Sequence, residues 1–188
     1  MRRVISTAAV AASLVTALVV GVTPANAAGN ATTITGGGSS FQDDFTTKCA
    51  AKFSAKSGKS VTYTKSSSGT GRTNFNSGSI DFAGSDSYKA TTRAGVYVPI
   101  SGAPIALFAN VGGLKELKLT PAVAGQIFDG TIKTWNDGAI AALNKGVKLP
   151  ATAIAPQYRS GTSGTTYALT NWFQQVVGGA WQGSDDFG

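Results

Sequence analysis

The sequence predicts an α/β fold built on a parallel sheet. Three runs typical of β-strands alternate with helical patterns, and polar turns rich in glycine or serine follow them. The strand runs are residues 32–35, 60–64 and 79–84. Strands that alternate with helices are typical of parallel sheets, in which ligands bind at the carboxyl ends of the strands. We therefore expect any binding site to lie at that edge.

A glycine turn at residues 36–40 precedes the first predicted helix, and a second, shorter helix runs through Phe75. The first helix has apolar residues at four-residue steps, which are Phe41, Phe45, Cys49 and Phe53. This spacing predicts one apolar helix face. Because Cys49 is in step with the aromatic residues, we expect a buried core thiol.

The rest of the chain predicts a second lobe. Residues 95–100 and 103–109 are rich in β-forming side chains and are interrupted by prolines. Thr120 followed by Pro121 is typical of a helix start, and a further helix follows Asp137. The last predicted helix has one apolar face, made of Leu169, Trp172, Phe173, Val176 and Val177. We expect residues 28–102 to belong to the first lobe and residues 103–188 to the second.

Residues 1–27 have the pattern of an export signal. Arg2 and Arg3 precede an apolar run at residues 8–22, and an A-x-A cleavage pattern ends at Ala27. The run is too short for a spanning helix, so we expect a secreted, extracytoplasmic chain in the cell envelope or periplasm, with no membrane insertion after cleavage. Of the 16 basic residues 14 then remain against 9 acidic ones, a net charge of +5 without a basic stripe, which argues against nucleic acid.

The composition excludes several kinds of chemistry. The chain has no histidine and one cysteine. Serine–histidine catalysis, histidine metal sites and cysteine zinc clusters are therefore excluded. We expect no enzymatic activity, no metal and no cofactor.

An anion site is the working hypothesis for the loop before the last helix. Arg159 offers a planar guanidinium, and Ser163, Gly164 and Thr165 lie where the helix begins. Free backbone N–H groups and the positive end of the helix dipole favour an anion there. The alternative is that these small residues only form a turn and an N-cap.

Three further polar residues fall just past the ends of the three predicted strands. They are Ser40, Ser68 and Asp86. Since the carboxyl ends of parallel strands meet at one edge, a shared rim is geometrically reasonable.

Four segments carry a resemblance to a known family. They are residues 35–41, residues 67–69 with 79–86, residues 124–137, and Arg159 with residues 163–165. With these segments in this order, the chain resembles the PstS-like phosphate-binding proteins of bacterial phosphate ABC transporters, which have the type II periplasmic binding protein fold. The resemblance implies two hinged lobes with phosphate between them, and Asp86 as acceptor of a phosphate proton. It implies phosphate contacts from Ser40, the Phe41 backbone N–H, Ser68, Asp86, Arg159, Ser163, Gly164 and Thr165.

Two departures from the family pattern stand out. Gly161 occupies the position where the family usually has an aspartate that orients the arginine. The chain is also about half as long as is usual in the family, so we expect a fold that is incomplete at the C-terminus, as in a truncated form.

The expected function is therefore that of a secreted substrate-binding protein that captures inorganic phosphate for the permease subunits of an ABC importer. One alternative is a binding protein for tungstate or molybdate, because Gly161 breaks the usual pattern. Another is a phosphatase with Ser68 or Ser163 as nucleophile, which the absence of histidine disfavours. A third is a cell-wall interaction protein or a remnant without a transport role.

Overall fold

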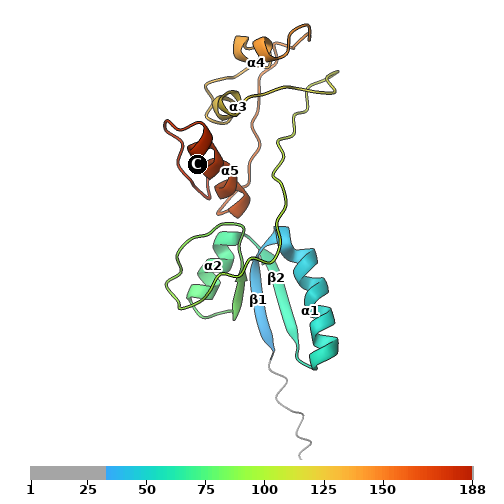
Figure 1. Ribbon diagram of the computed structural model, residues 1–188, viewed down its shortest axis with the longest axis vertical. Helices are drawn as coiled ribbons and strands as arrows, with labels where there is room; N and C mark the ends of the chain where they lie inside the picture. Colours follow the sequence, from blue (N-terminus) through green and yellow to red (C-terminus); the bar gives the residue numbers. More distant parts are fainter. Residues whose placement is uncertain (1–32, 188) are drawn as a thin grey trace, which may run out of the picture. The chain divides into compact units, whose positions relative to one another are not determined.

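The computed structural model describes residues 33–187, so the predicted export signal lies outside the described residues. Within the described residues, no helix is long and apolar enough to span a membrane. The elements, in chain order in Figure 1, are β1 (Ile34–Ser39), the 3₁₀ turn η1 (Ser40–Gln42), α1 (Asp43–Ser57), β2 (Val61–Ser66), α2 (Ser68–Asn76), β3 (Phe82–Gly84), α3 (Pro121–Phe128), α4 (Gly138–Leu143) and α5 (Gly164–Val176).

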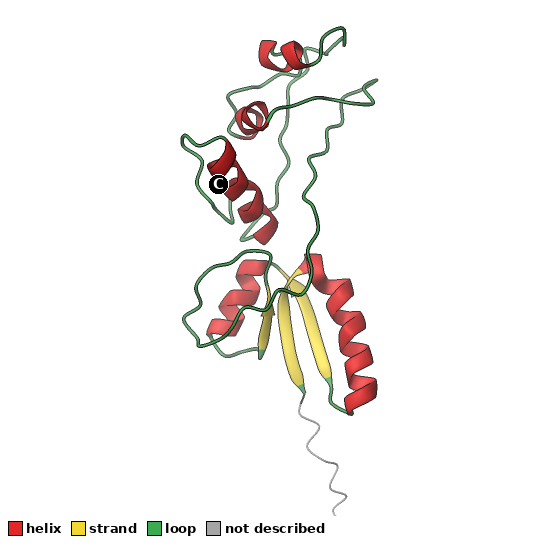
Figure 2. Cartoon of the chain, viewed as in Figure 1, coloured by secondary structure: helices red, strands yellow, loops and turns green. Residues whose placement is uncertain are grey.

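The three strands form one parallel sheet in the order β2-β1-β3, which confirms the predicted α/β class. Figure 2 shows them side by side. In the register of the sheet, Ser39 at the end of β1 pairs with Ser66 at the end of β2. Gly38 pairs with Gly84 at the end of β3. All three strands therefore end at one edge of the sheet.

The glycines of residues 36–38 lie inside β1, so the prediction of a glycine turn there was wrong. The reason is tertiary packing. The ring of Phe82 occupies the space where a Cβ of Gly36 would stand, and Gly38 lies against the backbone of Gly84 with φ of 134°. Glycine lets the neighbouring elements approach β1 more closely than any side chain would allow.

Helix α1 has Asp43 and Asp44 in its first turn, and Gly58 caps its C-terminus in the left-handed conformation. The prediction that Cys49 is buried was wrong, because its side chain is exposed. Phe45 and Phe53 are 46% and 48% exposed, whereas Ala50 is buried. Within the described residues the helix thus buries a different face from the one that the four-residue spacing indicates.

Residues 95–109 contain no strand, contrary to the two β-rich runs that the composition predicts. Val96 and Phe108 are 89% and 95% exposed. A strand exists only where another backbone pairs with its N–H and C=O groups, and no described segment pairs with this one. Strand propensity alone was therefore not sufficient.

Helices α3 and α4 enclose a small apolar core of Val123, Ile127, Ile132 and Ile140. The predicted start of α3 is confirmed, since the Thr120 side chain accepts a hydrogen bond from the Val123 N–H and Pro121 follows as the first helical residue. These local signals set where the helix begins. The division into lobes at residue 102 stays a prediction.

Helix α5 begins at Gly164, with Ser163 as its N-cap. Its predicted apolar face is only partly buried: Phe173 is fully buried, whereas Trp172 and Val176 are 41% and 50% exposed. Thr166 and Thr170 are buried instead. The Thr170 hydroxyl satisfies its hydrogen-bonding capacity by bonding the backbone at Thr166 and Ser184.

Candidate anion-binding site

Ser68 and Asp86 meet at the carboxyl edge of the sheet. Ser68 is the first residue of α2 and is only 2% exposed, and Asp86 follows β3 by two residues. The Asp86 backbone N–H donates to the Ser68 hydroxyl over 3.1 Å. The edge predicted from the order of the elements thus does bring two of the candidate residues into contact.

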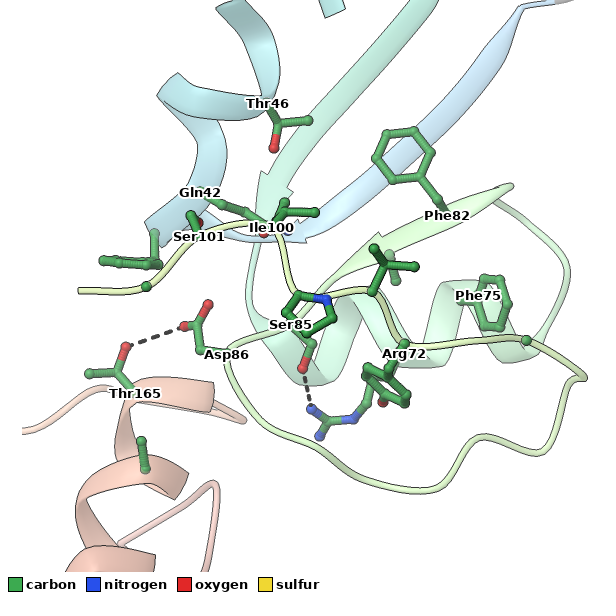
Figure 3. Close-up of a pocket in the computed structure, with 18 of the residues that line it drawn as sticks. Gln42, Thr46, Arg72, Phe75, Phe82, Ser85, Asp86, Ile100, Ser101 and Thr165 are labelled. Carbon is green, nitrogen blue, oxygen red and sulfur yellow. Dashed lines mark hydrogen bonds between the residues drawn. The ribbon is translucent and has the colours of Figure 1, made fainter. Parts of the chain in front are cut away.

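The start of α5 packs against this pair. A Cβ on Gly164 would overlap the Ser68 hydroxyl and would lie 2.9 Å from the Cβ of Asp86. The Thr165 hydroxyl donates to the Asp86 carboxylate over 3.4 Å, as Figure 3 shows. Four of the eight candidate residues, Ser68, Asp86, Gly164 and Thr165, therefore lie together, and Gly164 is the residue that permits their close approach.

The helix starts of α2 and α5 lie next to each other. The Ser67 hydroxyl caps α2 and lies 3.2 Å from the hydroxyl of Thr162, just before α5. The Gly69 N–H donates to the Thr162 carbonyl over 3.1 Å. The positive dipole ends of two helices thus lie next to each other, which favours an anion beside them.

Ser163 acts as the cap of α5, an acceptor role that leaves its own O–H proton available to donate. Its hydroxyl accepts a hydrogen bond from the Thr166 N–H over 3.3 Å, and its side chain is buried. The turn-and-cap interpretation of this loop therefore holds for Ser163. It does not conflict with an anion site, because a capped helix start still presents its first N–H groups.

The turn after β1 contributes differently. Ser40 is exposed, and the Phe41 N–H already donates to the Ser39 hydroxyl over 3.1 Å. Phe41 nevertheless lines a pocket whose wall also includes Asp86 and Thr165. The structure thus places Phe41 in the lining of the pocket, while its backbone N–H has another partner.

Tyr63, on β2, is hydrogen-bonded to the turn after β1. Its hydroxyl donates to the Ser39 carbonyl over 2.8 Å and accepts from the Gln42 amide. Burial raises the pKa of Tyr63, and the negative charges of Asp86 and Asp43 raise it further. The phenol therefore stays protonated and keeps the turn after β1 in place.

Arg159 is exposed and makes no hydrogen bond or ion pair with other residues in the range 33–187. Its neighbour Tyr158 stacks on Phe187 with ring centroids 4.8 Å apart. Gly161, in place of the family's aspartate, has φ of 75° and open space around it. The described structure does not bring Arg159 to Asp86.

The pocket itself has a volume of about 980 Å³, far larger than a tetrahedral oxyanion. Much of its wall is the segment 93–106, and Asp86 and Thr165 line it as well. Across residues 33–187, no group of histidine, cysteine, aspartate or glutamate side chains could hold a metal.

No pattern in the sequence points to Arg72 or Asp185. The guanidinium of Arg72 donates to the hydroxyls of Ser85 and Ser87, on either side of Asp86, and to the carboxylate of Asp185. No local spacing could have shown this pair, since 113 positions separate the two residues. Their contact is a product of the tertiary structure.

Residues 23–185 match a family model described as a PBP superfamily domain. The phosphate-binding protein PstS of Pasteurella multocida is 40% identical over 152 residues, which are 78% of this chain and 44% of the relative. PstS 3 of Mycobacterium leprae is 39% identical over 134 residues, 66% of this chain and 36% of the relative.

A further relative, PstS 3 of Mycobacterium tuberculosis strain H37Rv, is 34% identical over 164 residues, 81% of this chain and 44% of its own length. The chain thus spans less than half the length of these curated relatives. All three relatives are named for phosphate binding.

Proposed function

The chain belongs to the PBP superfamily and is PstS-like, and from this premise we propose that it captures inorganic phosphate as a substrate-binding protein. The observation that carries the proposal is the meeting of two helix starts at Asp86. Dipole ends and N–H groups of α2 and α5 supply positive potential there, and the Thr165 hydroxyl holds the Asp86 carboxylate beside them.

The strength of such a site is sufficient for capture. A hydrogen bond to a charged group contributes roughly 1.5–3 kcal/mol, and micromolar affinity requires about 8 kcal/mol. A handful of N–H and O–H donors at the two helix starts can therefore hold the ion. Mostly neutral donors suit this task because they need no additional buried charge.

Asp86 would select for phosphate within this site. An ionised carboxylate accepts a hydrogen bond from a protonated phosphate oxygen, but it repels sulfate, which carries no proton to donate. The role that the resemblance assigns to Arg159 remains part of the proposal. A movement that brings the loop at residues 158–162 to the anion would supply its guanidinium.

The residues 28–102 and 103–188 are proposed to form two parts that enclose the anion by a hinged closure. We further propose secretion, through the signal at residues 1–27, and delivery of phosphate to the permease subunits of an ABC importer. The names of the relatives support the binding step, and the signal-like sequence supports export.

Isothermal titration of the purified chain with phosphate, sulfate, molybdate and tungstate tests the proposal. We expect heat of binding with phosphate and none with sulfate at the same concentrations. Tighter binding of molybdate or tungstate would move the assignment to those anions. A folded chain that binds none of the four, or phosphate and sulfate equally, would contradict the proposed function. A phosphomonoester assay on the same sample is expected to show no hydrolysis.

Replacing Asp86 by asparagine is expected to lower the ratio of phosphate to sulfate affinity by about tenfold or more, the equivalent of one charged hydrogen bond. The substitution removes the acceptor for the phosphate proton and also the charge that repels sulfate. Asp44→Asn, on the exposed first turn of α1, serves as the control. An unchanged ratio in folded Asp86→Asn protein would remove Asp86 from its selective role.

A further inference from the structure

Arg72 is a nearly buried arginine that lines the same pocket as Asp86 and Thr165. Its side chain is 11% exposed, and one end of the guanidinium donates to the hydroxyls of Ser85 and Ser87 over 3.1 and 2.6 Å. The bond to Ser85 is drawn in Figure 3. The other end pairs with Asp185 at 2.5 Å. A buried charge of this kind is stabilised only by such a full set of partners.

Asp185 links this arginine to the start of α5. Its side chain is 7% exposed, and its second carboxylate oxygen forms an ion pair with Lys89 at 2.5 Å, without the angles of a hydrogen bond. Its backbone carbonyl accepts the Ser163 N–H over 2.9 Å. One residue thus ties Arg72 and Lys89 to the cap of α5.

The two serines flank Asp86 in the chain, so their positions determine where Asp86 is presented. The Ser85 hydroxyl donates to the Ser87 carbonyl over 2.7 Å and accepts the Ser87 N–H over 3.3 Å. This small hydrogen-bonded turn holds Asp86 between its two anchored neighbours. One nitrogen of the Arg72 guanidinium, Nη1, donates to both serine hydroxyls, while the other, Nη2, reaches Asp185. The planar fork thus holds both anchors and the carboxylate at once, which the single nitrogen of a lysine would have to do alone.

We propose that Arg72 and Asp185 form a buried ion pair that positions Asp86 against the start of α5 and thereby sets the selectivity between phosphate and sulfate. Arg72 acts on the turn at residues 85–87, and Asp185 acts on the cap at Ser163. The inference rests on the proposed function. Neither residue needs to touch the anion, so both are positioning residues.

The test compares Arg72→Lys, Arg72→Gln and the double variant Arg72→Gln/Asp185→Asn with the unmodified chain. Titration with phosphate and with sulfate gives the affinity ratio, and thermal unfolding gives the stability. We expect Arg72→Gln to lower the ratio about tenfold, as for one lost hydrogen bond to a charged group. The affinity ratio of Arg72→Lys is expected to lie between those of the unmodified chain and Arg72→Gln, because lysine keeps the charge but not the planar fork.

The double variant separates an effect on selectivity from the loss of stability expected in Arg72→Gln. Arg72→Gln alone leaves the buried Asp185 carboxylate with Lys89 only, whereas the double variant removes both buried charges. An unfolded fraction lowers the binding stoichiometry and leaves the affinity ratio of the folded fraction unchanged. We therefore expect the double variant to show the same reduced ratio as Arg72→Gln with higher stability.

Arg93→Gln is the matched control. Arg93 is also a partly buried arginine, but its guanidinium donates to the carbonyls of Phe75 and Ile80 and not to the turn around Asp86. We expect this variant to lose stability and to keep the affinity ratio.

A wild-type ratio in any folded Arg72 variant would overturn the inference and leave the proposed function standing. If Arg72→Lys is the only variant that folds, its phosphate-to-sulfate affinity ratio alone decides whether the inference holds. An unmodified, folded chain that fails to bind phosphate would overturn both proposals together.

Discussion

Replacing Gly164 by alanine is expected to weaken phosphate binding by about tenfold to hundredfold, the range that overpacking by one methyl group implies. The added Cβ would overlap the Ser68 hydroxyl and approach the Cβ of Asp86 to 2.9 Å and its backbone N to 3.0 Å. Since backbone atoms cannot rotate away, the start of α5 must move back from Asp86. Titration with phosphate, together with thermal unfolding, measures the effect.

Gly138→Ala is the matched control for this variant. Gly138 is also the first residue of a helix, α4, and an added Cβ meets nothing within 4 Å. We expect the control to keep its affinity for phosphate. If Gly164→Ala protein folds and binds phosphate as tightly as the unmodified chain, the close approach of α5 to Ser68 and Asp86 is not needed for binding.

Replacing Gly71 by alanine is expected to lower the free energy of unfolding by about 2 kcal/mol, the middle of the range for overpacking. Gly71 lies inside α2, where alanine would normally gain up to about 1 kcal/mol in helix propensity. Here its Cβ would stand 2.6 Å from the Cα of Gly38 and 3.0 Å from the carbonyl of Gly37. Because both neighbours are backbone atoms of β1, the helix and the sheet must separate. The free energy that this separation costs is larger than the gain in helix propensity.

Urea unfolding of Gly71→Ala protein measures this change. Gly112→Ala is the control, since its added Cβ has open space and its φ is not in the left-handed region. We expect the control to stay within about 0.5 kcal/mol of the unmodified chain. A stabilised Gly71→Ala variant would mean that helix propensity outweighs the contact between α2 and β1.

Much of the local structure could be predicted from neighbouring residues. The Thr120-Pro121 start of α3 and the Ser163 cap of α5 are interactions within three positions along the chain. The alternation of strands and helices likewise predicts parallel strands that end at one edge. Propensity, capping and periodicity act over such short separations, so they can be predicted from neighbouring residues.

Predictions that depended on partners far along the chain were less successful. Cys49 has the spacing of a core residue, but the face of α1 that it shares is exposed in the described structure. The composition of residues 95–109 is typical of strands, but no described segment pairs with them. A helix face or a strand is buried only when another element covers it, which spacing alone does not specify.

The sequence by itself determined the α/β order of the elements, the positions of the helix starts, and the polar residues that follow each strand. Only the tertiary structure decided which of those residues meet: it joins Ser68, Asp86, Gly164 and Thr165 and leaves Arg159 exposed. It also pairs Arg72 with Asp185 across 113 positions. The physical reason is that capping and periodicity are short-range, whereas a site forms where distant segments pack closely enough to exclude water and share hydrogen bonds.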